Sequence, residues 1–103
     1  MSDGPWLERP RLLGLHIGEI ASFVALVDHD GFTAGARAMN VSQGAFSARI
    51  FRLEQALGVT LVDRSVKRLT LTREGRAFQP LARSLLVLLG AVVDSMDAHR
   101  AGA

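Results

Sequence analysis

Hydrophobic residues recur at helical spacing in the first half of the chain and predict three short helices. One is expected over Leu15–Val27, and a second, rich in alanine and glycine, over Ala34–Met39. A third is expected to begin after Ser42, which can cap its amino end, and to run to about Leu57. Gly58 can adopt the left-handed backbone that ends a helix. The short connection between the last two helices predicts a helix-turn-helix unit.

After the third helix the spacing becomes alternating, which predicts a β-hairpin. Its strands are expected at Val59–Val62 and Lys67–Leu71, joined by a turn that carries positive charge. Thr72 can then cap a long helix that continues to about His99. The predicted fold is therefore mainly α: a winged helix-turn-helix, with three helices and a two-stranded β-hairpin wing, followed by a long linker helix.

The long helix carries more apolar surface than one small domain can cover. Its central run, Ser84–Val93, has ten mostly apolar residues, against the roughly 20 that a membrane-spanning helix needs. We therefore expect no membrane span, and we expect a second subunit to cover the helix and form a dimer. The residues of this expected dimerisation stripe are Phe78, Leu81, Leu85, Leu88, Leu89, Val92 and Met96.

A chain of 103 residues is long enough for one modest hydrophobic core. We divide it into a flexible arm over 1–14, the winged helix-turn-helix over 15–71, the linker helix over 72–99 and a tail over 100–103. The absence of cysteine excludes disulfides and thiolate metal sites. The first residues lack the basic-then-apolar order of a signal peptide, so the expected location is the cytoplasm.

Charge is distributed unevenly along the chain. Residues 37–76 contain eight basic and three acidic side chains, whereas residues 1–36 contain two basic and five acidic ones. The remainder is balanced. A basic block in a small domain favours a polyanionic partner, although an ordinary solvated surface accounts for the charge equally well.

The predicted third helix has a second face that solubility alone does not explain. Its apolar residues face the core, while the opposite side carries the small residues Gly44 and Ala48, with Gln43 and Ser47 at the edge. A major groove admits one α-helix, and glutamine, serine and alanine can contact base edges there. Arg52 lies further along the helix, where a phosphate contact is expected. These features predict a DNA-recognition helix.

Three segments of the chain resemble a known family. They are FTAGARAMNVSQGAFSARIFRLEQALGV at Phe32–Val59, LVDR at Leu61–Arg64 and LTREG at Leu71–Gly75. Together and in register, they resemble the amino-terminal domain of LysR-type transcriptional regulators, over about residues 15–89. The resemblance implies a winged helix-turn-helix that binds a two-fold related site in double-stranded DNA. It also implies a linker helix through which two identical subunits dimerise.

The same resemblance assigns roles to individual residues. The base-reading positions of the family's recognition helix are occupied here by Gln43, Gly44, Ser47 and Ala48. Backbone contacts are expected from Thr33, Ser42, Arg52, Arg64 and Arg68, and also from Lys67 near the tip of the hairpin. Family members usually have proline at the position of Gly44 and a larger polar or basic residue at Ala48, so we expect base reading to depend on fewer contacts here. Phe51 stands where a basic residue is common.

Other classes of function find less support in the sequence. No serine, histidine and acid triplet has a recognisable context and no glycine-rich phosphate loop occurs, so we expect no enzyme. The cluster Asp28-His29-Asp30 is expected to form a turn rather than a metal site, because His16 and His99 have no spacing relation to it. We expect no cofactor and no small-molecule site in this chain. The alternative function is an interaction module whose long helix pairs with another regulator, without productive DNA binding of its own.

Overall fold

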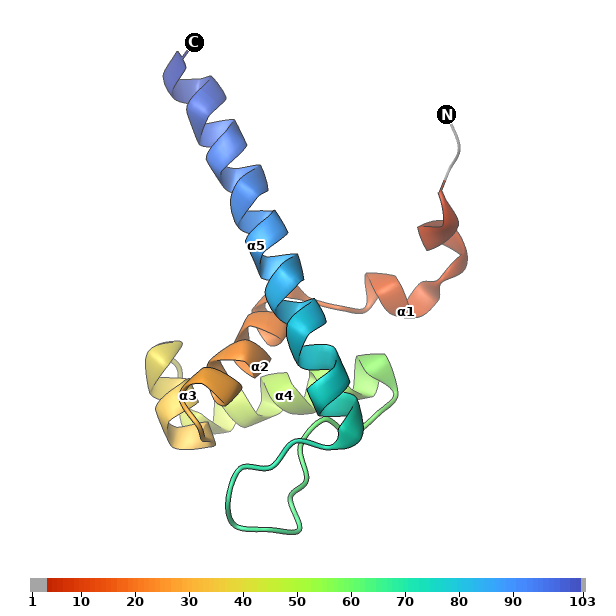
Figure 1. The fold of residues 1–103 in the computed structure, drawn as a ribbon, viewed down its shortest axis with the longest axis vertical. Helices are drawn as coiled ribbons and strands as arrows, with labels where there is room; N and C mark the ends of the chain where they lie inside the picture. The colour runs from red at the N-terminus through yellow and green to blue at the C-terminus, as the bar shows by residue number, and fades with distance from the viewer. Residues whose placement is uncertain (1–3, 103) are drawn as a thin grey trace.

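The computed structural model of the chain describes residues 4–102. Helices α2, α3 and α4 form a compact body, α5 rises from it, and α1 leads away to the amino terminus on the other side (Figure 1). The elements in order are η1 Pro5–Glu8, α1 Pro10–Leu13, α2 Ile17–Asp28, α3 Phe32–Ala38, α4 Gln43–Leu57 and α5 Arg73–Gly102. The predicted order of helices is confirmed, and the comparisons with known proteins below confirm the fold class.

The hydrophobic core lies where α2, α3, α4 and the first part of α5 meet. Phe23 and Leu26 of α2 and Phe46, Ile50 and Leu53 of α4 are fully buried. The three α4 residues lie three or four positions apart, so they share one side of the helix, and that side faces the core. The opposite side of α4 is therefore left for solvent or for a partner.

Both predicted ends of the recognition helix α4 are confirmed. The Ser42 hydroxyl accepts a hydrogen bond from the Ala45 backbone N–H at 3.1 Å, and Gly58 ends the helix with φ of 73°. Helix α3 begins at Phe32, two residues before the predicted start at Ala34, and no side chain caps it. Thr33 thus lies inside the first turn of α3. The Thr33 hydroxyl instead donates to a side chain of α4, as described below.

The predicted wing is reduced to a loop with a single antiparallel bridge, between Val62 and Leu71. Two backbone hydrogen bonds flank the bridge: Asp63 N–H donates to Thr70 at 2.8 Å, and Thr72 N–H donates to Leu61 at 3.0 Å. No β-strand forms in the part of the chain that the structure describes, so the predicted two-stranded hairpin is not confirmed. We refer to the segment 59–72 as the wing loop.

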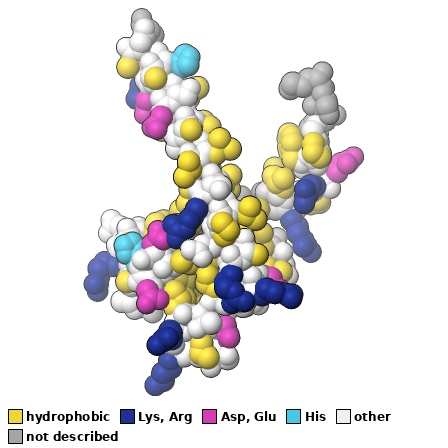
Figure 2. Space-filling model, viewed as in Figure 1, with side chains coloured by type: hydrophobic (Ala, Val, Ile, Leu, Met, Phe, Trp, Pro, Cys, Tyr) yellow, Lys and Arg dark blue, Asp and Glu magenta, His cyan; other side chains and the backbone are white. Residues whose placement is uncertain are grey.

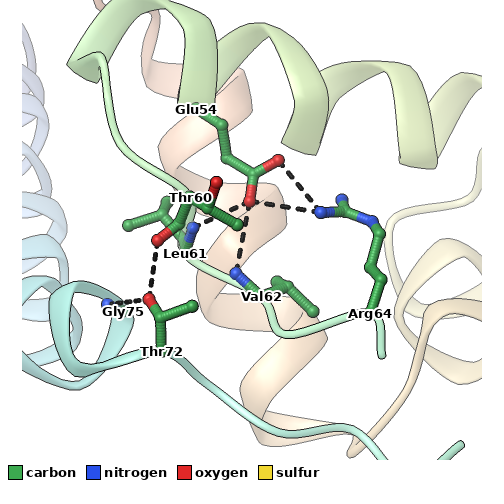
Figure 3. A network of polar contacts seen from close by, with 7 residues as sticks. All are labelled: Glu54, Thr60, Leu61, Val62, Arg64, Thr72 and Gly75. Atoms are coloured by element: carbon green, nitrogen blue, oxygen red, sulfur yellow. Dashed lines mark hydrogen bonds and ion pairs between the residues drawn. The ribbon is translucent and has the colours of Figure 1, made fainter. Parts of the chain in front are cut away.

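The carboxylate of Glu54 binds backbone donors at the start of the wing loop. It is buried and accepts hydrogen bonds from the backbone N–H groups of Leu61, at 2.8 Å, and Val62, at 3.2 Å (Figure 3). Arg64 Nη1 donates to the same carboxylate at 3.1 Å. Backbone donors at the start of the wing loop are thus bound to α4, and they are not available to a longer ladder.

Helix α5 begins at the base of the wing loop, as predicted. The Thr72 hydroxyl accepts from the Gly75 N–H at 3.0 Å and donates to the Thr60 carbonyl at 2.6 Å (Figure 3). The helix continues through Pro80 to Gly102, a few residues beyond the predicted end. The hydroxyl of Thr72 therefore joins the start of α5 to the first part of the wing loop.

The first half of α5 packs on the body. The ring of Phe78 lies 5.2 Å from that of Phe23, and Ala82 is buried in the core. Arg83 pairs with Asp28 at the end of α2, and this hydrogen bond lowers the pKa of the Asp28 carboxyl. The second half of α5 extends away from the body and is largely exposed (Figure 1).

By length and composition alone, α5 is long and apolar enough to cross a membrane. The estimate from the sequence considered only the uninterrupted ten-residue run. Mostly apolar residues before Arg83 extend the charge-poor stretch of the helix beyond this run, to 18 residues with no more than two charges. A helix that packs against another protein subunit meets the same criterion. The length and composition of α5 therefore fit a protein partner as well as a membrane.

The segment before α2 differs from the irregular arm that the sequence predicts. It contains the 3₁₀ turn η1 and the short helix α1, each with a proline at its start. Arg11 Nη1 donates to the Leu57 carbonyl at 3.5 Å, which brings α1 next to the end of α4. The prediction of flexibility for residues 1–3 falls outside the described residues.

Replacing Glu54 with alanine is expected to destabilise the fold. The N–H groups of Leu61 and Val62 would lose their acceptor in a buried place, which should lower the free energy of unfolding by about 2–4 kcal/mol. Glu54→Gln keeps a carbonyl acceptor and should lose less. Urea denaturation followed by circular dichroism measures both variants, and a Glu54→Ala protein as stable as the parent would contradict this role.

Candidate nucleic-acid interface

The solvent-facing side of α4 is small and uncharged near its amino end. Gln43 and Gly44 are exposed, and Ser47 and Ala48 are partly exposed one turn further on. A Cβ atom added at Gly44 would meet no neighbouring atom of the described residues within 4 Å, so this position is open to an approaching partner. All four predicted base-reading residues therefore lie together on one accessible surface.

The position of α4 depends on a close approach of α3. A Cβ atom at Gly35 would lie 2.6 Å from the Phe46 ring, so only glycine permits this packing. Phe32, at the start of α3, contacts the same ring edge-on, with centroids 6.1 Å apart. The turn between the two helices contains Asn40, which takes a positive φ of 58°. Together these contacts fix the helix-turn-helix geometry.

We call the surface formed by Gln43, Gly44, Ser47 and Ala48 the recognition surface. A hydrogen bond between α3 and α4 orients its first residue, Gln43. The Thr33 hydroxyl of α3 donates to the side-chain oxygen of Gln43 at 3.0 Å. The Gln43 amide group then keeps both N–H donors free for another partner. Thr33 was predicted to contact the DNA backbone; in the free protein its hydroxyl contacts Gln43 instead.

Arg52 is held by a carboxylate of α2. Its Nε donates to Glu19 Oε2 at 3.1 Å, and the Arg52 side chain remains 58% exposed. The other Glu19 oxygen is buried and has no hydrogen-bond partner among residues 4–102. Because the guanidinium has two further nitrogens, Arg52 can bind a phosphate while it stays paired.

Arg64 is also held within the protein. It donates to Glu54, and its guanidinium carbon lies 5.6 Å from the centre of the Phe32 ring, in a cation–π contact. The side chain is 47% exposed and borders the depression lined by Ser47 and Phe51. Arg64 therefore places positive charge beside the recognition surface, on the side of the wing loop.

The tip of the wing loop carries cations without such anchors. Lys67 and Arg68 are exposed, and neither makes an ion pair or a side-chain hydrogen bond with any described residue. Basic side chains gather at the end of the molecule where the wing loop lies (Figure 2). Nearby, hydrogen bonds from Ser65 lower the pKa of the Asp63 carboxyl, so Asp63 keeps its negative charge close to these cations.

Two residues at the interface, Arg37 and Phe51, were not predicted to have a function. Arg37 is exposed on α3 and lines a depression with Thr33 and Gln43, next to the first turn of α4. Its spacing of four residues from Thr33 could have indicated the shared helix side. Phe51 is 57% exposed on α4, which is unusual for a side chain of this size.

The predicted dimerisation stripe divides into two groups. Phe78 and Leu89 are partly buried, and Phe78 packs on Phe23 of its own subunit. The other residues are between 39% and 67% exposed in the single chain, and they are Leu81, Leu85, Leu88, Val92 and Met96. The second group is the surface that remains for a partner.

Comparison with known proteins assigns the chain to a family. Residues 17–76 match the family described as bacterial regulatory helix-turn-helix proteins of the lysR family. The chain is 38% identical over 88 residues to the HTH-type transcriptional regulator PtxR of Pseudomonas aeruginosa, with 84% of this chain and 28% of that protein covered. It is 34% identical to a probable hydrogen peroxide-inducible genes activator of Streptomyces viridosporus, with 82% and 27% covered. The chain thus spans less than a third of either relative, and both are regulators rather than enzymes, which supports the predicted absence of enzymatic activity.

Solved structures show the same fold. One is the complex of the BenM DNA-binding domain with catB site 1 DNA, at a TM-score of 0.80 and 28% identity, with 85% of this chain and 95% of that chain covered. Another is Vibrio fischeri DarR in complex with DNA, at a TM-score of 0.78 and 33% identity, with 82% and 29% covered.

Two glycine substitutions should separate packing from surface in the helix-turn-helix. Gly35→Ala forces the Phe46 ring to move and should lower the free energy of unfolding by about 1–3 kcal/mol. Gly44→Ala points into open space and should leave stability unchanged or slightly raised, because alanine favours a helix. Thermal denaturation of both proteins measures the difference, and equal stabilities would contradict the close packing at Gly35.

Proposed function

We propose that this chain, which belongs to the lysR family of bacterial regulatory helix-turn-helix proteins, binds a two-fold related site in double-stranded DNA as a homodimer and so regulates transcription. The observation that carries the proposal is the accessible, uncharged surface formed by Gln43, Gly44, Ser47 and Ala48 at the start of α4, with cations on both sides. Arg37 borders it on the side of α3, and Arg64 borders it on the side of the wing loop. The DNA complexes of the similar BenM and DarR structures support the same assignment.

Base reading falls to the first two turns of α4, which would enter the major groove. Gln43 and Ser47 supply hydrogen-bonding groups, while Gly44 and Ala48 allow close approach. Because Thr33 occupies the Gln43 oxygen, the amide nitrogen is the group that faces outward. We therefore expect Gln43 to prefer a base edge that offers an acceptor, rather than a bidentate contact with adenine.

Phosphate contacts are assigned to residues around this surface. Lys67 and Arg68 would contact the backbone from the wing loop, and Arg64 and Arg52 would do so with the guanidinium nitrogens that their internal pairs leave free. Ser42 uses its oxygen as the cap of α4, so its hydroxyl proton remains available to a phosphate oxygen. Such contacts supply most of the affinity, and they make it depend on salt.

The dimer is assigned to the exposed stripe of α5, from Leu81 to Met96. A contiguous apolar stripe of this length is rarely left in water on a monomeric protein. Two-fold pairing of identical stripes gives a closed assembly. A regulator that binds bacterial chromosomal DNA would act in the cytoplasm, which is where we propose this protein is located.

Substitutions at Gln43 and Thr33 test base reading. Gln43→Ala should remove about 1–3 kcal/mol of discrimination at one base pair of the bound site. Thr33→Val frees the Gln43 side chain and should relax the same position, whereas Thr33→Ser keeps the hydroxyl and should resemble the parent. The measurement is a gel-shift titration on the site selected from random duplexes and on its single-base variants. Unchanged discrimination by Gln43→Ala would contradict the assignment.

Salt dependence tests the wing loop and separates the two candidate functions. Lys67→Ala and Arg68→Ala should each reduce the slope of log affinity against log salt by about 1, because each removes one phosphate contact. Arg100→Ala, near the far end of α5, is the matched control and should keep the parent slope. DNA binding that is absent or insensitive to salt would favour the protein-interaction module instead.

A further inference from the structure

The segment Pro5–Leu13, formed by η1 and α1 and called here the N-terminal arm, exposes large hydrophobic side chains. Trp6, Leu7, Leu12 and Leu13 are 46%, 52%, 42% and 64% exposed. None of these four belongs to the hydrophobic core or packs against it. Four such residues in a nine-residue segment form a patch of the kind that normally has a partner. The arm also precedes residues 17–76, which match the family.

The arm is attached to the body at one point. The guanidinium of Arg11 lies over the end of α4, where it donates to the Leu57 carbonyl, and a Cβ atom at Gly58 would be 3.1 Å from its Nη1. Backbone hydrogen bonds from Leu12 to Arg9 and from Leu15 to Leu12 continue the helical turns toward the body. The arm therefore has a defined direction relative to α4.

The apolar sides of the arm and of α5 face each other across open space. In Figure 2 the hydrophobic side chains of the arm lie toward α5, and its charged side chains point the other way. Hydrophobic side chains also follow the edge of α5 that faces the arm, and no atoms fill the space between them in this view. The two elements thus form the sides of an apolar gap.

We propose that the second half of α5 from a second copy of this chain fills the gap, so that each arm clasps the partner's linker helix. The inference rests on the dimer of the proposed function. Across the assembly the order would be arm, partner α5, own α5 and partner arm. This order is unchanged by a two-fold rotation between the two helices, so the interface closes on itself.

The exposed residues of α5 fit a helix that is covered on two sides. Leu88 and Val92 belong to the dimerisation stripe, which pairing of the two α5 helices would cover. Val87 is 73% exposed and lies about 100° around the helix from Leu88, so that pairing would leave it uncovered. A clasping arm from the partner would cover this second side.

The absence of native cysteine allows a direct test by crosslinking. Two versions of the full chain with tags of different size are co-expressed, one with Leu13→Cys and the other with a single cysteine at Val87, Val93 or Met96. A short bismaleimide is then added. Each chain holds one cysteine, so a product of mixed size can form only between subunits. Lys67→Cys, on the wing loop, replaces the α5 cysteine as the matched control.

We expect the mixed product with at least one α5 position and none with Lys67→Cys. Sedimentation of the same samples at micromolar concentration reports whether a dimer is present. A dimer without any crosslink to α5 overturns the clasp and leaves the proposed dimer intact. A monomer overturns both, and equal crosslinking to Lys67→Cys shows random collision and overturns the clasp.

A second measurement asks whether the arm contributes to assembly. Leu13→Ser, or deletion of the arm up to Leu13, should raise the dimer dissociation constant by about tenfold or more, because each dimer contains two arms. Glu8→Ala, on the same arm, is the control and should leave the constant unchanged. Sedimentation equilibrium gives the constants, and a Leu13→Ser protein that dimerises like the parent contradicts the clasp.

Discussion

The buried carboxylate of Glu54 holds the recognition helix, the wing loop and the linker helix together. It lies on α4, accepts from the backbone of Leu61 and Val62, and pairs with Arg64. The Leu61 carbonyl in turn accepts from Thr72, which caps α5. A Cβ atom at Gly75 would lie 2.2 Å from that carbonyl oxygen, so α5 begins in close contact with the same strand-like segment. The exposed surface of α4 and the start of α5 are thus connected through one side chain and its backbone partners.

Carboxylates of the body also hold two of the basic side chains around the recognition surface. Arg52 and Arg64 each pair with a carboxylate of the body, Glu19 or Glu54, before any ligand arrives. Such pairs reduce the net positive potential, yet they hold long side chains in place and so lower the entropy lost on binding. Lys67 and the neighbouring Arg68 lack this restraint. The interface therefore combines arginines held by ion pairs beside α4 with cations at the tip of the wing loop that pair with no described carboxylate.

Local signals in the sequence were sufficient where a single residue decides the structure. Ser42 and Gly58 end α4 as predicted, because a cap and a left-handed glycine act within a few residues. The wing loop was predicted less well, because its N–H groups bind Glu54, a residue seven and eight positions away whose acidic side chain gives no sign of burial. The hydrogen bond from the Thr33 hydroxyl to Gln43, ten residues away, was not predicted for the same reason. A hydrogen bond between residues far apart in the sequence produces no periodic pattern, whereas the burial of one helix face does.

The contacts that hold the start of α5 on the body also determine where the far end of this helix lies. Phe78 on Phe23 and the pair between Arg83 and Asp28 fix the angle at which α5 leaves the body. Helical rise makes its 30 residues about 45 Å long, longer than one turn of DNA. A contact along the exposed half of α5 is therefore far from the α4 helix of the same subunit. A small change in the angle at which α5 leaves the body would then move the two recognition helices of a dimer by a large amount relative to each other. A clasp at that end would restrict such rotation, so the arm would influence which half-site spacing the dimer accepts without touching DNA.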